Sequence, residues 1–197
     1  MRALLLSGGL DSTALAYWLK PEWAITFDYG QRGAQGELRA ARQIAQRLSI
    51  QHLELRVPLS HVGTGDLSGR DPLPMAPTPD WWPCRNQMLL SLAAPWALAN
   101  GVQVLIVGCL ASDRSHGDAD PEFIAAMNSL FVLQKIPIRV DAPAIHLTKS
   151  ELIRRSQVPF DFLTMAHSCH TGEYACGSCR ACNAHRSTLE DLGLTSF

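Results

Sequence analysis

Residues 3–13 read Ala-Leu-Leu-Leu-Ser-Gly-Gly-Leu-Asp-Ser-Thr, an apolar run that passes into a turn of glycines and small polar residues. A short apolar run that ends at a glycine turn is typical of a strand buried on both faces of a sheet. The polar residues after the glycines are typical of a helix N-terminus, and Pro21 limits that helix to about residues 12–19. The chain therefore begins with a predicted strand, a tight turn and a helix.

The same alternation continues along the chain. Apolar runs predict further strands at residues 23–27, 52–57, 102–107 and 136–140, and helical spacing predicts helices at 38–48, 86–100 and 123–133. Strands separated by helix-length segments pair in parallel, so we predict an α/β fold with a doubly wound parallel sheet. Such a sheet binds ligands at the carboxyl ends of its strands. We expect this domain to cover residues 1–147 and a small helical segment to cover 148–197.

One stretch interrupts this alternation. Residues 58–83 hold six prolines and several glycines, and they separate a predicted strand from a predicted helix. Long connections of this kind within a compact domain are commonly functional, so we predict a long ordered loop or lid.

The composition narrows the class of protein. The chain has 197 residues, of which 47% are apolar and 18% charged, and its formal net charge is −1. That balance predicts a buried core and no binding of bulk nucleic acid. No apolar run reaches the ~20 residues that span a membrane, and the apolar start is too short for a signal peptide. We therefore expect a cytoplasmic protein, whose thiols stay reduced.

The glycine turn carries the clearest chemical signal. Unpaired amides at a helix start, together with the hydroxyls of Ser7, Ser12 and Thr13, form an anion site. The turn lacks the Gly-Lys-Ser/Thr of a Walker loop. Its Ser-Gly-Gly-x-Asp-Ser order resembles the PP-loop of ATP pyrophosphatases. Asp11 suits this site if Mg²⁺ lies between its carboxylate and the phosphates, whereas the plainer alternative is an ordinary helix-capping turn.

Four of the six cysteines lie close together in the sequence. Cys169, Cys176, Cys179 and Cys182 supply four thiolates, two pairs of which are separated by two residues. This spacing predicts a structural zinc site without an open position, and an iron–sulfur cluster is the main alternative. His167, His170 and His185 could replace a thiolate but are expected to be loose surface residues. We expect Cys84 to lie in a loop and Cys109 in the core.

Together, the glycine turn and the cysteine motif resemble the QueC family of 7-cyano-7-deazaguanine synthases. Residues 28–32 (Asp-Tyr-Gly-Gln-Arg) and 82–86 (Trp-Pro-Cys-Arg-Asn) are similar to the family's Asp-Tyr-Gly-Gln-Arg-His and Val-Pro-Gly-Arg-Asn. The resemblance continues through Gly108, Asp113, residues 121–123, Lys149, residues 168–169 and Arg186. It therefore covers the whole chain.

The resemblance implies an ATP-dependent ligase. In this reaction the carboxylate of 7-carboxy-7-deazaguanine is adenylated and then takes up ammonia, giving an amide and finally a nitrile. The implied ATP- and Mg²⁺-binding residues are Ser7, Gly8, Gly9, Leu10, Asp11, Ser12 and Thr13. The implied catalytic residues are Asp11, Arg32, Arg85 and Lys149. The implied substrate-binding residues are Tyr29, Gln31, Arg32, Trp82, Arg85, Asn86, Asp113 and Asp118.

Departures from the family pattern leave alternatives open. Gly33 stands where the family has histidine, Ala119 and Asp120 stand where it has cysteine and arginine, and the chain is shorter than expected. Because the departures concentrate at residues 112–120, the same adenylation could instead serve acyl transfer to a protein amine in a bacterial anti-phage defence system. A tRNA sulfurtransferase using Cys84 or Cys109 and a non-catalytic zinc scaffold are further alternatives. The sequence does not distinguish a monomer from a homodimer.

Overall fold

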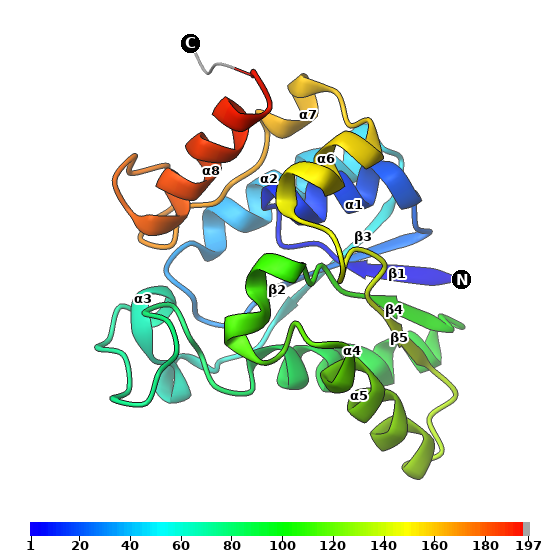
Figure 1. Ribbon diagram of the computed structural model, residues 1–197. Coiled ribbons are helices and arrows are strands. Elements are labelled where there is room, and N and C mark those ends of the chain that lie inside the picture. The colour runs from blue at the N-terminus through cyan, green and yellow to red at the C-terminus, as the bar shows by residue number, and fades with distance from the viewer. Residues whose placement is uncertain (195–197) are drawn as a thin grey trace.

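A central parallel sheet organises the computed structural model, which describes residues 1–194 (Figure 1). Its strands lie in the order β3-β2-β1-β4-β5, and every neighbouring pair is parallel. Their bounds are β1 Arg2–Leu5, β2 Trp23–Asp28, β3 Gln51–Arg56, β4 Val104–Ile106 and β5 Arg139–Asp141. The chain builds outward from β1 to β3 and then returns to the other side of β1 as β4. This reversal places a topological switch point between β1 and β4, and the predicted doubly wound fold is confirmed.

Helices cover both faces of the sheet (Figure 1). One face carries α1 (Leu10–Leu19), α2 (Ala34–Arg47), α6 (Lys149–Ser156) and α7 (Phe160–Leu163), and the other carries α4 (Arg85–Ala99) and α5 (Pro121–Leu133). Successive residues of β1 alternate between the two cores: Leu4 packs with α1 and α2, whereas Ala3 packs with α4 and α5. Burial on both faces explains why this strand reads as a continuous apolar run.

Two predicted strands begin more than one residue away from their start in the structure, whereas the others agree to within one residue at each end. β4 is shorter than predicted because Val102 donates its backbone N–H to Ala97 at the end of α4. β5 begins three residues later than predicted because Ile136 closes the C-terminus of α5, donating to the carbonyl of Phe131. In both places apolar residues that resemble a strand in the sequence instead complete a helix end.

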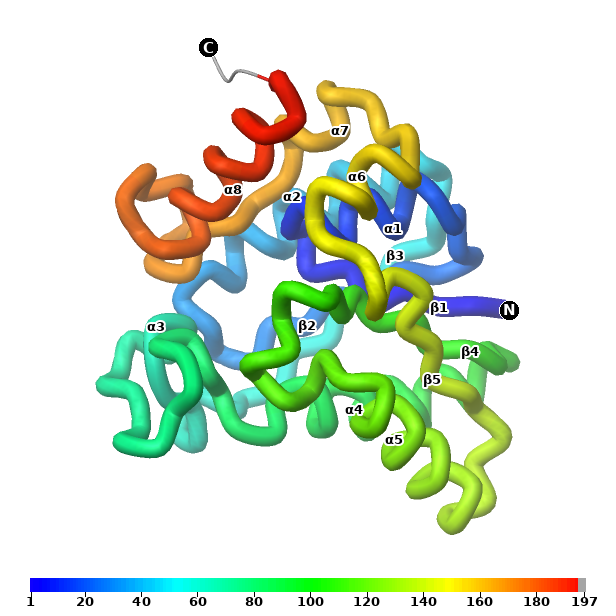
Figure 2. The backbone as a smooth tube through the Cα atoms, in the orientation of Figure 1, coloured from blue at the N-terminus to red at the C-terminus, as the bar shows by residue number. Residues whose placement is uncertain are grey.

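The proline-rich loop is an ordered part of the structure (Figure 2). It contains a 3₁₀ turn, Ser60–Val62, and the short helix α3, Gly65–Ser68. Trp82 is almost fully buried and packs edge-on against Tyr29, with ring centroids 5.0 Å apart. The predicted ordered loop is therefore confirmed, and it is fastened to the end of β2.

The C-terminal segment packs on the same core as the first helices. Leu152 of α6 and Leu189 of α8 (Arg180–Asp191) are buried together with Leu10 and Leu15 of α1. His167 donates its backbone N–H to the carbonyl of Gly8 at 2.8 Å, which fastens this segment to the glycine turn. The boundary at residue 147 stays a prediction.

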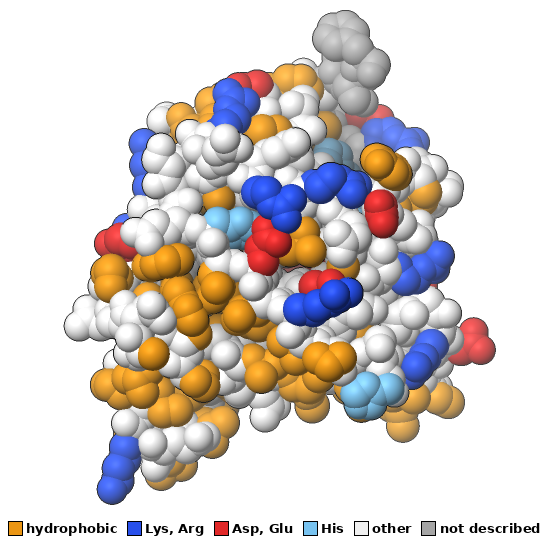
Figure 3. Space-filling view, turned by 180° about the vertical axis from the view of Figure 1, so that it is seen from behind, with side chains coloured by type: hydrophobic (Ala, Val, Ile, Leu, Met, Phe, Trp, Pro, Cys, Tyr) orange, Lys and Arg blue, Asp and Glu red, His pale blue; other side chains and the backbone are white. Residues whose placement is uncertain are grey.

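Some large apolar side chains are exposed on the helices of one face of the sheet. Leu92, Leu98, Val132 and Leu133 of α4 and α5 are exposed, and apolar side chains gather in the corresponding part of the back view (Figure 3). Within residues 1–194, no helix is both long and apolar enough to cross a membrane.

Candidate functional site

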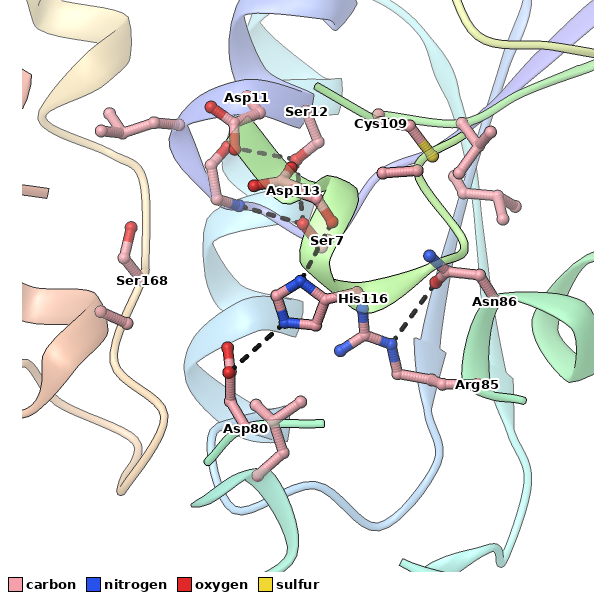
Figure 4. A pocket seen from close by; sticks show the side chains of 18 of the residues that line it. Ser7, Asp11, Ser12, Asp80, Arg85, Asn86, Cys109, Asp113, His116 and Ser168 are labelled. Atoms are coloured by element: carbon pink, nitrogen blue, oxygen red, sulfur yellow. Dashed lines mark hydrogen bonds and ion pairs between the residues drawn. The ribbon is translucent and has the colours of Figure 1, made fainter. Parts of the chain in front are cut away.

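A cavity of about 540 Å³ opens at the carboxyl ends of β1 and β4. Its walls come from the glycine turn, the end of β2, the proline-rich loop, the start of α4, the 110–119 segment and the region around the cysteines. This is the switch point of the sheet, where ligands of doubly wound proteins bind. Figure 4 shows Ser7, Asp11 and Ser12 grouped at one end, Asp80 and Arg85 at the other, and His116 between them.

Helix α2 packs closely against the glycine turn at Gly8. Gly8 has φ +77°, and a Cβ atom there would lie 2.7 Å from the carbonyl oxygen of Glu37 and 2.9 Å from Cβ of Ala40. Only glycine combines this backbone conformation with this space. The tight turn directs the start of α1 into the cavity, where Ser7 Oγ lies 3.1 Å from Ser12 Oγ. The arrangement offers amides and hydroxyls to an anion.

Asp11 and Lys149 form an ion pair beside this turn. Lys149 Nζ lies 2.9 Å from Asp11 Oδ2, while Asp11 Oδ1 is buried and has no hydrogen-bond partner among the described residues. Burial raises the pKa of Asp11 against the opposing effect of Lys149, and the attraction of Asp11 raises the pKa of Lys149 although burial opposes it. A carboxylate oxygen left unpaired next to an anion site fits the requirements of Mg²⁺ bound between carboxylate and phosphate.

Arg85 and Asn86 form the opposite wall, in the first turn of α4. Arg85 faces Tyr29 and Asp118, and its Nε lies 3.4 Å from Asn86 Oδ1. Burial raises the pKa of the Tyr29 hydroxyl, so Tyr29 stays neutral. This wall therefore combines the cation of Arg85, the carboxylate of Asp118 and neutral polar groups within reach of a planar ligand.

A charged cluster joins three distant segments at the cavity. Asp80 of the proline-rich loop accepts hydrogen bonds from Arg180 at the start of α8 and from His116 Nε2, the latter at 3.4 Å. His116 Nδ1 lies 3.2 Å from the carbonyl oxygen of Asp113. Nε2 also lies 3.1 Å from the Thr78 hydroxyl, and the hydrogen bond to Asp80 raises the pKa of His116 although burial opposes it. We call Asp80, His116 and Arg180 the ion cluster.

The structure places most of the sequence-predicted residues in the cavity wall. The lining includes Ser7, Gly9, Leu10, Asp11, Ser12, Tyr29, Arg85, Asn86, Asp113, Asp118 and Lys149. It does not include Gly8, Thr13, Gln31, Arg32 or Trp82.

The structure shows where each of these five residues lies instead of in the cavity lining. Gly8 supports the turn from below, and Thr13 Oγ1 donates to Gly9 O at 2.7 Å. Gln31 is buried with its amide bonded on both sides, and Trp82 packs behind Tyr29. Arg32 is exposed beside Gly69, outside the cavity, because its backbone N–H is bonded to Leu67 and its side chain runs over the proline-rich loop.

Sequence reasoning missed several residues of the lining. Glu37, Asp80, His116, Ser168 and Arg180 line the cavity, and only a contact map could reveal most of them, because they are ordinary polar residues in the sequence. The prediction that His167, His170 and His185 are loose surface residues is wrong. All three are half-buried in the cavity wall, and His185 Nδ1 lies 2.8 Å from Ser168 Oγ.

The two remaining cysteines lie where they were expected. Cys84 is exposed just before α4, and Cys109 is buried. Burial raises the pKa of the Cys109 thiol to about 12, which disfavours the thiolate that a sulfurtransferase needs.

The four clustered cysteines form a site that can hold a metal ion. Their sulfur atoms all lie within 4.8 Å of one another, and two pairs are 4.0 Å apart. Tetrahedral zinc with bonds of about 2.3 Å requires sulfur atoms about 3.8 Å apart, so the donor set fits such an ion. Gly177 (φ +74°) forms the turn between the ligands. Within residues 1–194, these four cysteines are the group of three or more His, Cys, Asp or Glu side chains that lie close enough together to hold a metal ion.

The fold and the cavity define an α/β protein of the PP-loop type, with a glycine-turn anion site at the switch point and a four-cysteine site beside it. Within that class the chain belongs to the QueC family, since the family model for "Queuosine biosynthesis protein QueC" matches residues 2–193.

Similar proteins agree with this assignment. The chain is 32% identical over 217 residues to "7-cyano-7-deazaguanine synthase" of Methanothermobacter thermautotrophicus, covering 98% of this chain and 96% of that one. It is 35% identical over 211 residues to the protein of the same name from Methylococcus capsulatus, covering 97% and 94%. Both alignments are longer than the 197 residues of this chain, so both relatives have residues without a counterpart here, as the expected shortness implies.

Proposed function

We propose that the protein is an ATP-dependent ligase that adenylates the carboxylate of 7-carboxy-7-deazaguanine. Ammonia then displaces AMP, giving an amide, and a second adenylation leads to the nitrile, 7-cyano-7-deazaguanine. Family membership and the names of the relatives support this substrate. The observation that carries the proposal is the unpaired, buried Asp11 Oδ1 beside the glycine turn and Lys149.

The phosphate end of the cavity suits the first step. A carboxylate resists attack because its leaving group would be oxide, and adenylation replaces oxide with AMP. The amides and hydroxyls of the glycine turn hold the phosphates, and Lys149 stabilises the charge that develops on the departing pyrophosphate. Asp11 would hold Mg²⁺, which neutralises phosphate charge when bound.

The opposite wall suits the carboxylated ring. Arg85 offers two parallel N–H donors to the substrate carboxylate, and Asp118 beside it accepts hydrogen bonds from the amino and imino groups of the guanine-like edge. Asp113 lies instead beside Asp11 at the phosphate end of the cavity (Figure 4). Tyr29 packs against the ring. Arg32 lies outside the cavity, so the proposal leaves charge neutralisation to Arg85 and Lys149.

The cysteine site has a structural part in this proposal. Zinc bound by four thiolates leaves no position for water, so it would stabilise the segment that carries Ser168, Arg180 and His185 into the cavity wall.

A second candidate keeps the adenylation and changes the acceptor to a protein amine. The observation that favours it is the position of the altered 112–120 segment, because Ser112, Asp113, Ser115 and His116 lie directly in the cavity wall. A change there alters what reaches the acyl group without altering the phosphate end.

Pyrophosphate release tests the proposal. With ATP, Mg²⁺ and 7-carboxy-7-deazaguanine the protein is expected to release pyrophosphate, and Asp11→Ala is expected to reduce the rate at least about 100-fold. Absence of release from the wild type would eliminate both candidates. Mass spectrometry of the products formed with ammonia then distinguishes a free amide or nitrile from a modified protein acceptor.

A further inference from the structure

Glu37 is a cavity carboxylate to which the proposed function gives no part. It belongs to the first turn of α2 and lies directly beneath the glycine turn, where its backbone oxygen limits the space at Gly8. Its side chain lines the cavity. A carboxylate in this position needs an explanation, because the phosphates proposed to bind at this end of the cavity are themselves anionic.

The other carboxylates of the cavity are already engaged. Asp11 is paired with Lys149, and Asp80 with Arg180 and His116. Asp118 lies beside Arg85 at the ring-binding wall, and Asp113 lies near Asp11 and Lys149 at the phosphate end (Figure 4). Within residues 1–194, no cation lies within ion-pair distance of Glu37, and its one side-chain hydrogen bond comes from a neutral amide, Gln31 Nε2 to Glu37 Oε2 at 2.9 Å.

Gln31 holds this carboxylate in a fixed position. Its Oε1 accepts from the backbone N–H of Tyr29 at 2.9 Å, and its Nε2 also donates to the carbonyl of Phe27 at 3.0 Å. Because both ends of the buried amide are fixed by the backbone, the remaining N–H points Glu37 toward the cavity and leaves Oε1 available. Gln31, outside the cavity lining, thereby acts as a positioning residue.

The proposed second step requires a proton acceptor. At neutral pH most ammonia is present as ammonium, which has no lone pair to attack the acyl carbon. A carboxylate both attracts this cation and takes its proton, whereas the neutral imidazoles in the wall do not attract it. We propose that Glu37 binds ammonium and accepts its proton, so that ammonia is formed beside the acyl-adenylate.

The step balances in atoms and charge. Ammonium transfers one proton to Glu37, and the freed lone pair forms the C–N bond to the acyl carbon. The C–O bond to AMP breaks with its electron pair on the phosphate oxygen, and that oxygen takes the second proton from nitrogen. Burial raises the pKa of Glu37 to about 7, which supports a role in proton transfer at neutral pH.

The variant Glu37→Gln separates this role from the proposed function on which it rests. Exchange of labelled pyrophosphate into ATP, driven by the carboxylated substrate without ammonia, is expected to stay close to the wild-type rate. Ammonia-dependent amide formation at pH 7 is expected to fall about 100-fold or more. Hydroxylamine, which is largely unprotonated at that pH, should give the hydroxamate at similar rates with both proteins. Glu190→Gln, an exposed change on α8, is the matched control and should leave all three rates unchanged.

Raising the pH provides a second measurement on the same variant. The fraction of free ammonia rises with pH, so Glu37→Gln should regain amide formation relative to the wild type. The charged or titratable groups that face Glu37 are Asp28 and Tyr29 at the end of β2, Arg85 on α4 and His167 ahead of the cysteine site. The inference is overturned if hydroxylamine and ammonia are affected equally or if pyrophosphate exchange falls in parallel. No exchange with the wild-type protein would instead refute the proposed function.

Discussion

The two ends of the cavity are built in different ways. At the phosphate end, Ser7 and Gly9 come from the turn between β1 and α1, and Asp11 and Ser12 come from the first turn of α1. At the other end, the ion cluster brings together the proline-rich loop, the 3₁₀ turn Ala111–His116 and the start of α8, and Asp80 and Arg180 are 100 residues apart in the sequence. One end is specified by a local motif and the other by the tertiary fold, so substitutions at the two ends should have different consequences.

The largest expected effect is that of Gly8→Ala at the phosphate end. The new Cβ would meet backbone of α2 at 2.7 Å in a left-handed conformation, and neither α2 nor the sheet can move easily. We expect a loss of about 3 kcal/mol or more in the free energy of unfolding, and loss of pyrophosphate release. Urea denaturation and the release assay measure the two effects.

Gly117→Ala is the matched control for this substitution. Gly117 has a similar φ, +75°, but no described atom lies within 4 Å of the added Cβ. Only the backbone preference is then lost, about 1 kcal/mol. Equal losses at Gly8 and Gly117 would show that the close packing under the glycine turn contributes nothing.

The next largest effect is expected at the cysteine site, where a bound metal would stabilise the end of the cavity that carries the ion cluster. The wild-type protein is expected to contain one zinc ion per chain, and Cys179→Ser is expected to lose it together with several kcal/mol of stability. Because Arg180 follows Cys179 directly, the variant should also release Asp80 and make the proline-rich loop susceptible to proteolysis. Metal analysis and limited proteolysis check both outcomes. Cys84→Ser, outside the cysteine site, should retain zinc, and a metal-free, folded wild type would contradict the assignment.

This contrast also explains what the sequence could predict. The parallel sheet, the glycine turn and the cysteine site follow from local patterns, because residues 3–13 and 176–182 carry their own geometry. Arg85 and Lys149 were assigned from family motifs, and both line the cavity. Asp80, His116 and Arg180 have no local signature, since their contacts depend on how residues 58–83 fold over the sheet. The prediction that Arg32 lies in the cavity failed for a related reason. The motif fixes the backbone position of Arg32, but the direction of its side chain depends on how the proline-rich loop folds.

A smaller effect is expected for Asp80→Asn in the ion cluster. Arg180 is about half exposed, at 48%, so solvent screens its pair with Asp80 and we expect a loss of only about 1–2 kcal/mol. Loosening the loop should raise KM for the carboxylated substrate more than it lowers kcat, because the loop lines the cavity without touching the phosphate end. An equal loss in kcat would place Asp80 in the chemistry instead.

The stability difference between the wild type and Asp80→Asn should depend on pH, because His116 and Asp80 both titrate. The raised pKa of His116 means that its stabilisation is complete below its unfolded value of about 6.5 and is lost as pH rises through the folded value. Although burial opposes it, hydrogen bonds from His116 and Thr78 lower the pKa of Asp80, so its contribution is lost as pH falls below about 4. The stability difference between wild type and Asp80→Asn should therefore be largest between about pH 4 and 6.5. A difference independent of pH would show that the hydrogen bond to His116 carries no stability.

The smallest expected effect is a gain in stability at the start of α4, beside the ring-binding wall. Cys84 has φ 58°, a left-handed conformation that glycine adopts without strain, and the family motif that this stretch resembles has glycine there. Cys84→Gly should stabilise the fold by about 0.5–1 kcal/mol, since relief of the backbone strain exceeds the added entropy of the unfolded chain. Cys84→Ala keeps the Cβ atom and should give no gain, which separates strain from any effect of the thiol. If alanine stabilises as much as glycine, the backbone at Cys84 is not strained, and the position of Arg85 and Asn86 depends on the packing of Trp82 alone.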